Sequence, residues 1–441
     1  MAHIKPFRAW RYQPDLVPRL STLIAPPFDT ISESEKHELY RQPYNSIHLS
    51  VPVTNQEAAQ DLRQWKSQGI LRQDADPAIY GYYQQFARPG DDVVHYQKGF
   101  ICFIEATSWD EKVVLRHEDT IPHSVEDRVE LLAATQLQAS PTHGLYTDTA
   151  CRLEVFLDAS MERPLYDVED RQGVRHIISC IRNPAIIREF VEVLRNKPVI
   201  LADGHHRYES SLRYRKQCEA ATVLEASAAD ASAADASGAD ASGADALSGC
   251  HYHMMYLTNT EGSNAHILPT HRVLRSWPTL NLDAAMEKAR RYFSVEPLKR
   301  MEDIPGAILN KPGSFGVALA YRAYRLQLKP DKFDEFPTAL AAEIKELDTT
   351  AVHYFFIDRV LGIPYDEQRK SAYLSYESDF AQVVQQLERG SAALALVLQP
   401  VSMNQVKRVC YGGHLMPQKS TYFYPKAVSG FVFGSIRPDE L

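Results

Sequence analysis

Lys197-Pro-Val-Ile-Leu-Ala-Asp-Gly-His-His-Arg-Tyr208 is the most informative segment of the chain. Residues 198–202 form a short apolar run, which is typical of a buried strand. After Gly204 the pattern becomes helix-like over residues 208–218. A strand that leads through glycine into a helix points the N–H groups of the first helical turn, and the positive end of the helix dipole, at whatever lies above the turn. The stretch therefore predicts an anion-binding turn, and phosphate is the natural ligand.

The polar residues of this turn suit phosphate chemistry. Gly204 lets the backbone approach a ligand closely, and Arg207 can bind phosphate oxygens in a bidentate manner. His205 and His206 can donate hydrogen bonds or relay protons. Asp203 can orient a substrate hydroxyl, act as a base or hold a metal ion. The alternative is structural: Asp203 caps the helix, and the two histidines are polar surface residues.

Around this turn, strand-like and helix-like segments alternate along the chain. The alternation predicts an α/β (α+β) fold in which helices cover a mixed sheet. The expected strands are residues 46–51, 99–105, 175–181, 198–202, 252–258 and 392–398. The expected helices are residues 32–41, 56–68, 128–139, 184–196, 208–218, 281–292, 337–346 and 349–361. Ser32-x-x-Glu35 has the form of a capping box, which supports the first helix.

A low-complexity segment rich in Ala, Ser and Asp interrupts the pattern at residues 220–248. Isolated aspartates recur there every five residues, at Asp230, Asp235, Asp240 and Asp245. Large apolar side chains are almost absent, so little burial can offset the entropy of ordering the segment. We expect a disordered surface insert; an acidic tract for calcium or a partner is the alternative. The insert would separate an N-terminal α/β region, 1–219, which carries the turn, from a C-terminal α/β region, 249–441, which completes the site.

Composition narrows the class of protein. The net charge of −8 and the pI near 6.1 give no overall basic field, so nucleic acid is an unlikely partner. The longest apolar runs, such as residues 392–398, fall far short of the roughly 20 residues that a membrane-spanning helix needs. No secretory signal is visible, and the six cysteines form no Cys-x-x-Cys pair. We expect a cytoplasmic protein with reduced cysteines.

A second cluster, Arg116-His-Glu-Asp-Thr120, combines acid, base and cation. A glutamate beside a histidine is a candidate general base, which makes Glu118 a candidate catalytic residue. Two carboxylates of this cluster could also share a divalent ion. If the protein carries out phosphotransfer, Asp203 and Glu118 are the candidate ligands for Mg²⁺. The alternative is a solvated, charged loop before the next helix.

Two further clusters could bind anions. His271 and Arg272 repeat the His-Arg pairing after Pro269, a residue that stiffens the backbone. Near the C-terminus, a compact trio of anion-binding residues is followed by a lysine that could neutralise a second phosphate: Lys419, Ser420, Thr421 and Lys426. Each of these clusters could also be purely structural.

Several familiar motifs are absent from the sequence. It has no Gly-x-x-x-x-Gly-Lys-Ser/Thr loop, no Gly-x-Gly-x-x-Gly turn, no His-Glu-x-x-His and no Gly-x-Ser-x-Gly. The common ATPase, dehydrogenase, zinc-protease and hydrolase interpretations therefore lose support.

Taken together, the motifs resemble the family catalogued as domain of unknown function 1015. The matching stretches begin at Ile4, Pro26, His117, Ala202, Leu268 and Met416. The turn Asp203-Gly-His-His-Arg207 is also similar to the phosphate-binding turn of the superfamily that unites ParB proteins, sulfiredoxin and free-serine kinases. That likeness implies a ParB/sulfiredoxin-like core with an additional α/β subdomain, and a nucleotide, ATP or ADP, bound at the turn. By analogy with the serine kinases, it implies Glu118 as the base.

The predicted function is phosphotransfer. The enzyme would be kinase-like or phosphatase-like and would act on a small hydroxylated metabolite such as serine or phosphoserine. One alternative is a nucleotide-binding regulator of the ParB type that does not turn its ligand over. Another is an interaction protein in which the polar turn is only structural.

Overall fold

The computed structural model describes residues 1–28, 30–88, 93–232, 249–262 and 266–441. The chain forms two compact units, and both are discontinuous in sequence. Unit 1 comprises Met1–Arg116, Thr120–Ala265 and Pro425–Leu441, and unit 2 comprises His117–Asp119 and His266–Tyr424. The structure thus groups the residues differently from the expected linear ranges 1–219, 220–248 and 249–441. The last residues of the chain return to the N-terminal unit.

Unit 1 is built on a mixed sheet with nine strands among the described residues. Its path runs β6 (Val114–Leu115), β11 (Val199–Asp203), β8 (Thr142–Tyr146), β12 (Tyr252–Asn259), β5 (Val94–Glu105), β4 (Tyr80–Ala87), β10 (Arg175–Ile178) and β9 (Tyr166–Glu169), and β1 (Ile4–Lys5) also pairs with β5. The β6–β11 and β8–β12 pairs are parallel, and the other pairs are antiparallel. The predicted α/β class with a mixed sheet is confirmed.

Both faces of this sheet are buried. Side chains of a strand point alternately to the two faces. Along β5, Phe100, Cys102 and Ile104 belong to one buried apolar cluster, whereas Ile101 and Phe103 belong to another. The sheet therefore lies inside unit 1 with apolar packing on each side, as a layered α/β unit requires.

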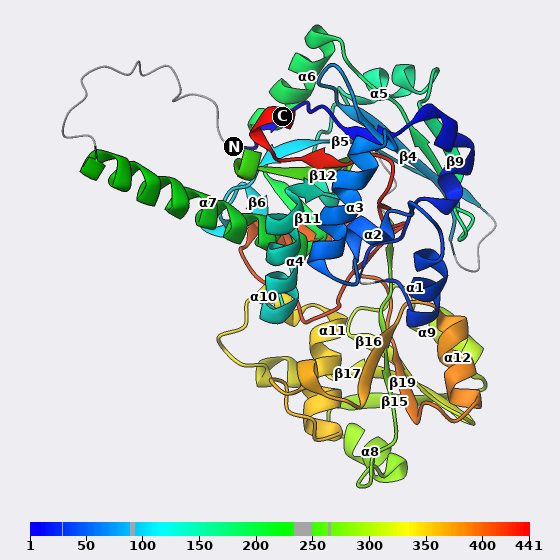
Figure 1. Cartoon of the computed structure of the whole chain (residues 1–441). Coiled ribbons are helices and arrows are strands. Elements are labelled where there is room, and N and C mark those ends of the chain that lie inside the picture. The colour runs from blue at the N-terminus through cyan, green and yellow to red at the C-terminus, as the bar shows by residue number, and fades with distance from the viewer. Residues whose placement is uncertain (29, 89–92, 233–248, 263–265) are drawn as a thin grey trace. The chain divides into compact units, whose positions relative to one another are not determined.

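Helices and short hairpins complete unit 1. The helices are α1 (Glu33–Tyr40), α2 (Ile47–Ser50), α3 (Asn55–Ser67), α4 (Pro122–Thr135), α5 (Glu154–Ser160), α6 (Pro184–Arg195) and α7 (His205–Ser232). Two small antiparallel pairs join β2 (Trp10–Tyr12) to β3 (Leu71–Gln73) and β7 (Leu137–Gln138) to β21 (Gly434–Ser435). Helix α7 packs against α4 (Figure 1). No helix among the described residues is both long and apolar enough to cross a membrane.

Several sequence predictions for unit 1 are confirmed. The strand expected at 198–202 is β11, and the helix expected at 32–41 is α1. The capping box of α1 is present, since the Ser32 side chain accepts from the N–H of Glu35 and the Glu35 side chain accepts from the N–H of Ser32. These signals are local, so the sequence alone reveals them.

The strand expected at residues 46–51 was wrong, because the chain forms α2 there. The side chain of Asn45 accepts a hydrogen bond from the N–H of Ile47 at 2.9 Å and donates to the carbonyls of Thr22 and Ile24. This side chain turns the backbone at the start of the short helix. Asparagine offers the backbone an alternative to strand pairing.

Two helix boundaries also differ from expectation. The helix expected at 128–139 is α4, which starts at Pro122 and ends before Gln136, a residue in the left-handed conformation. Proline suits the first turn of a helix because that turn needs no N–H from it. In the segment expected to be an insert, α7 continues through residues 220–232. Residues 233–248 lie outside the described residues.

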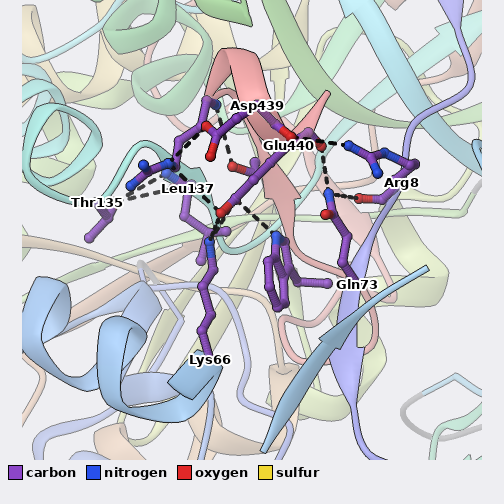
Figure 2. Close-up of polar contacts among 10 residues, drawn as sticks. Arg8, Lys66, Gln73, Thr135, Leu137, Asp439 and Glu440 are labelled. Carbon is purple, nitrogen blue, oxygen red and sulfur yellow. Dashed lines mark hydrogen bonds and ion pairs between the residues drawn. The ribbon is translucent and has the colours of Figure 1, made fainter. Parts of the chain in front are cut away.

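The C-terminus is tied into unit 1 by a polar cluster, which Figure 2 shows. The carboxylate of Glu440 accepts from Nε1 of Trp10 at 2.9 Å and from Nζ of Lys66 at 2.6 Å. Nε2 of Gln73 donates to the carbonyl of Glu440 at 2.5 Å. The side chains of Lys66 and Glu440 are only 17% and 13% exposed, so this ion pair is well shielded from solvent.

Unit 2 has its own antiparallel sheet of six strands among the described residues. Its order is β15 (Phe293–Leu298), β17 (Arg322–Leu328), β16 (Ser314–Leu319), β19 (Leu394–Val397), β14 (His271–Leu274) and β18 (Leu374–Glu377). A separate pair joins β13 (His266–Leu268) to β20 (Tyr422–Tyr424). Helix α12 (Phe380–Glu388) packs on β19 and β14 (Figure 1).

The remaining helices of unit 2 are short. They are α8 (Leu282–Ala289), α9 (Ile304–Ile308), α10 (Ala342–Lys345), α11 (Asp348–Ala351) and α13 (Met403–Tyr411), and a π-helical stretch, Val352–Val360, continues α11. The helix expected at 337–346 is reduced to α10. Phe336 and Leu347, which flank that range, are buried in the core, and this tertiary anchoring overrides the local helical pattern.

Candidate functional site

The predicted turn joins β11 to α7 through a single residue, Gly204. Its φ of +90° lies in the region that favours glycine. A Cβ atom at this position would lie 2.6 Å from Cγ2 of Thr142 and 2.9 Å from Nη2 of Arg207. Glycine is therefore required here both by backbone conformation and by the close approach of β8.

Asp203 ends β11 and is paired with two cations. Its Oδ2 accepts from Nη2 of Arg207 at 2.9 Å, and its Oδ1 is in contact with Nζ of Lys426. Burial alone would raise the pKa of Asp203, but Lys426 and Arg207 together hold that pKa well below its ordinary value. The carboxylate is therefore ionised at neutral pH, which suits holding cations or orienting a hydroxyl better than accepting a proton.

Arg207 is held rigidly in the first turn of α7. Nη1 donates to Oγ of Ser140 at 2.9 Å and to the carbonyl of Pro141 at 2.7 Å, while Nη2 is bound to Asp203. Its side chain is 11% exposed. Within the part of the chain that the structure describes, Nε of Arg207 is buried without a hydrogen-bond partner. The guanidinium is thus fixed on two edges and retains one donor for a further acceptor.

Of the two histidines of the turn, His205 is buried and His206 is half-buried. His205 is only 7% exposed. Nε2 of His206 accepts a hydrogen bond from the N–H of Ile121 at 3.0 Å, and its ring meets the ring of Phe28 edge-on. An accepting Nε2 places the proton of a neutral His206 on Nδ1.

A cavity of about 60 Å³ lies beside Arg207 within unit 1. Polar residues line part of it, among them Arg128, Ser140, Arg207, Ser210, Ser211 and His253. Its apolar wall includes Pro26, Phe28, Leu49, Leu131 and Leu132. A buried water needs roughly 10–15 Å³ of cavity volume, so this cavity has room for about four to six waters. A small polar molecule, or one end of a larger one, would fit.

A chain of hydrogen bonds connects this cavity to the turn. Oγ of Ser211 lies 2.7 Å from Nδ1 of His253, and Nε2 of His253 lies 2.9 Å from Oγ1 of Thr142. Burial, and secondarily the charge of Arg207, lower the pKa of His253 to about 3, so its ring is neutral at neutral pH. Thr142 is also the residue against which Gly204 packs. The cavity wall and the turn therefore share one polar network.

Lys426 was predicted to bind phosphate, and the structure instead places its ammonium group on Asp203. Its side chain is 13% exposed. The residue belongs to the C-terminal segment of unit 1, and 223 positions separate it from Asp203. Lys426 therefore contributes positive charge at the turn, in a pair that the sequence did not reveal.

The other predicted site residues lie in unit 2, where Arg272 is the most buried. It is 0% exposed, and its guanidinium donates to the carbonyls of Thr270 and Gln418 and to Nε2 of His353. Burial lowers the pKa of Arg272 to about 10. His271 accepts a hydrogen bond from the N–H of Leu398, and burial lowers its pKa to about 4.

The segments that contain Glu118 and the Lys419 trio meet within unit 2. The N–H of Met416 donates to the carbonyl of His117 at 2.8 Å, and Nε2 of His117 lies 2.8 Å from Oγ1 of Thr421. Oε1 of Glu118 is buried without a hydrogen-bond partner among the described residues. An unbonded carboxylate oxygen is suited to accepting a proton or a hydroxyl hydrogen bond.

The predicted trio does not present three equivalent donors. Oγ of Ser420 donates to the carbonyl of Pro417 at 2.5 Å, and Ser420 is only 2% exposed. Lys419 is exposed and has a φ of +55°, so it occupies the tip of a tight turn. Of the trio, Lys419 is the most accessible to an anion.

Several site residues escaped the sequence analysis. Ser210 and Ser211 lie three and four positions after Arg207, so they share its face of α7, and this spacing could have revealed them. Arg128 and His253 come from α4 and β12, and no local pattern joins them to the turn. For metal binding, the described residues contain no group of three or more His, Cys, Asp or Glu side chains suited to an ion. Mg²⁺ at Asp203 and Glu118 stays a prediction.

The fold and the turn define an α/β protein with a buried, charge-paired strand-to-helix junction. The chain belongs to the family described as "Protein of unknown function (DUF1015)", whose profile matches residues 4–350. The resemblance found in the sequence is thereby confirmed. No curated protein matches the chain.

Solved structures with detectable similarity have low identity to this chain. A free serine kinase in complex with AMP is 9% identical, with a TM-score of 0.36 over 77% of this chain and 93% of that chain. A conserved hypothetical protein from Pyrococcus furiosus is 11% identical, with a TM-score of 0.33 over 74% and 89%. SbnI from Staphylococcus aureus, with a C-terminal truncation, is 12% identical, with a TM-score of 0.33 over 75% and 86%.

Proposed function

We propose that the protein is a phosphotransfer enzyme, kinase-like or phosphatase-like, that acts on a small hydroxylated metabolite such as serine or phosphoserine. ATP or ADP would be the nucleotide, and Mg²⁺ the metal ion. The observation that carries the proposal is the rigid placement of Arg207 directly after a glycine turn and at the wall of a cavity. Phosphoryl transfer depends mainly on positioning and on fixed positive charge, which this junction supplies.

Roles at the turn follow from the contacts. Gly204 would let a phosphate approach the backbone of the turn, and Arg207 offers its remaining donor, Nε. Asp203 would keep Arg207 and Lys426 in place and orient a hydroxyl group. His205 and His206 would stabilise the transferred group. These roles require no change in the protonation of Asp203.

For proton transfer we propose Glu118, because one of its carboxylate oxygens is buried and has no hydrogen-bond partner among the described residues. His271, Arg272, Lys419, Ser420 and Thr421 would support phosphate binding. Arg272 and Ser420 are bound to neighbouring backbone carbonyls, so they would act by holding the loop that carries Lys419. General-base catalysis contributes typically about 10²- to 10⁴-fold to a rate.

The direct experiment is to incubate the full chain and Mg²⁺ with serine and either ATP or ADP, and separately with phosphoserine. Formation or loss of phosphoserine is followed by ³¹P NMR. We expect Arg207→Lys to reduce the rate about 100-fold, because lysine lacks the planar fork that Ser140, Pro141 and Asp203 hold. Arg213→Lys is the matched control, since it lies on the same helix and is 39% exposed.

A second pair of variants tests the base. Glu118→Gln should lower the rate about 100-fold or more, whereas Glu126→Gln, whose side chain is 57% exposed, should not. Absence of product with every substrate combination would overturn the enzymatic proposal. Equal activity of wild type and Arg207→Lys would overturn the role of the turn.

One observation favours the regulator as a second candidate. Both oxygens of Asp203 already contact cations of the protein, so the turn can hold an anion without a proton acceptor of its own. Calorimetric binding of ATP or ADP, with no product after hours, would support a nucleotide-binding regulator. Turnover of the bound nucleotide would exclude it.

A further inference from the structure

Unit 2 contains a cavity of about 370 Å³, which is larger than the cavity beside Arg207. It lies between the start of α11, the segment that follows β19 and the start of α13. Its polar lining consists of hydroxyl, amide and carboxylate groups, mainly those of Asp348, Thr349, Gln399, Ser402 and Gln405. No Lys, Arg or His is among the described residues that line it. A phosphate or another anion would find no positive side chain there.

Asp348 supplies the only charge in this lining among the described residues. Its Oδ1 accepts from the N–H of Gly313 at 2.5 Å, and its Oδ2 accepts from Nε2 of Gln399 at 2.6 Å. In the described part of the chain, no Lys, Arg or His forms an ion pair with this carboxylate. Burial raises the pKa of Asp348 above its ordinary value. Removing a carboxylate from water without a cation is costly, and a positively charged ligand would offset that cost.

The two hydrogen bonds also fix the direction of the carboxylate. Gln399 is itself held, because Nε2 donates to the carbonyl of Lys311 and Oε1 accepts from the N–H of Asn310. Each oxygen of Asp348 accepts one bond and retains a lone pair. The cavity therefore contains an oriented acceptor for a further donor.

We propose that this cavity binds a small organic cation with a primary ammonium group, which pairs with Asp348. Thr349, Ser402 and Gln405 offer hydroxyl and amide partners for a second polar group of the ligand, and Leu347 and Pro400 offer apolar surface for its carbons. A bare metal ion fits less well. Calcium takes 6–8 oxygen ligands and magnesium needs octahedral geometry, whereas this lining has one carboxylate in a space far larger than an ion.

This site is separate from the proposed phosphotransfer chemistry, since it needs neither nucleotide nor phosphate. The first test therefore uses the full chain without either. Ethanolamine hydrochloride at pH 7.5 is the probe, and ethylene glycol is its neutral counterpart, in which a hydroxyl replaces the ammonium. Binding is measured by ligand-observed NMR at constant ionic strength. We expect ethylene glycol to bind at least tenfold more weakly than ethanolamine.

Variants locate the binding. Asp348→Asn should weaken ethanolamine binding at least tenfold, whereas Asp331→Asn, an exposed carboxylate of the same unit with a side chain 69% exposed, should leave it unchanged. Gln405→Ala, which keeps the carboxylate, should weaken it by a smaller factor. Equal binding of the two probes to wild type would overturn the proposal, with no variant needed. If ethanolamine bound a folded Asp348→Asn protein as tightly as wild type, the binding site would not be at Asp348.

Discussion

Oγ of Ser211 lies 2.7 Å from Nδ1 of His253, and both residues are almost completely buried at the wall of the cavity beside Arg207. Nε2 of His253 lies 2.9 Å from Oγ1 of Thr142, the residue that packs against Gly204. A change at the cavity wall therefore reaches the turn through two hydrogen bonds and one van der Waals contact.

Gly204→Ala should destabilise unit 1 by about 2–4 kcal/mol, from a left-handed backbone and from overpacking. The added Cβ would lie 2.6 Å from Cγ2 of Thr142. Hydrogen exchange of β11 amides, measured by mass spectrometry, should become faster. Gly306→Ala is the control: it has no atom within 4 Å of its Cβ position, and its exchange should not increase. If the β11 amides of Gly204→Ala exchanged as slowly as those of wild type, the packing of Thr142 against Gly204 would not be as tight as described.

Lys426→Met should destabilise unit 1 by about 2–4 kcal/mol, because it leaves a buried carboxylate with one cation instead of two. The pKa of Asp203 is depressed in the folded protein. Its stabilising contribution is therefore present above the unfolded value near 3.9 and is lost as the pH falls through the folded pKa. The difference between variant and wild type in urea unfolding should accordingly shrink below about pH 4.

The control for this variant is Lys98→Met. Its ion pair with Asp158 is exposed, at 33% and 53% for the two side chains, so its loss should cost less than about 1 kcal/mol. If the two lysine variants lowered the free energy of unfolding equally, Lys426 would not be stabilising a buried ion pair.

Stability should fall as the pH drops below about 6.5, because unfolding exposes buried neutral histidines, His143 and His253 of unit 1 among them. Burial lowers the pKa of His143 and of His253 to about 3. The unfolded chain therefore binds more protons between these values, and each histidine costs up to about 1.4 kcal/mol per pH unit. In His253→Gln, the free energy of unfolding should fall less steeply between pH 7 and pH 5, as measured by urea unfolding at pH 7, 6 and 5. His37→Gln, an exposed histidine on α1, should leave it as in wild type.

Arg272→Lys should destabilise unit 2 by about 2–4 kcal/mol, since lysine cannot reach the two carbonyls and the imidazole that the guanidinium contacts together. The thermal transition measured by calorimetry should move to lower temperature. Arg300→Lys, whose side chain is 71% exposed, provides the comparison and should shift it little. A transition unaffected by Arg272→Lys would mean that this buried charge contributes nothing to unit 2.

The strand, the glycine and the helix of the turn were predictable because each has a local signal. The same holds for the capping box of Ser32 and Glu35. By contrast, the pairing of Lys426 with Asp203 joins positions far apart in sequence, and the wall contributed by Arg128 and His253 exists only after α4 and β12 have packed. Such partners are set by tertiary contacts, which no local pattern encodes.

The prediction for residues 46–51 failed for a related reason. Its alternating pattern suits a strand, but the side chain of Asn45 forms three hydrogen bonds to the backbone and starts a short helix instead. Hydrogen bonding by one side chain outweighed the strand propensity of six residues. Asparagine directly before this short alternating segment is the signal that could have indicated this outcome.

Residues 425–441 belong to unit 1 but are translated after all of unit 2. While the ribosome is still translating, the nascent chain has neither the ammonium group that reaches Asp203 nor the carboxylate that binds Trp10 and Lys66. Unit 2 can therefore finish folding before unit 1, although translation of unit 1 begins first. A chain that stops before residue 425 would therefore lack the cation that pairs with Asp203 and the carboxylate that binds Trp10 and Lys66.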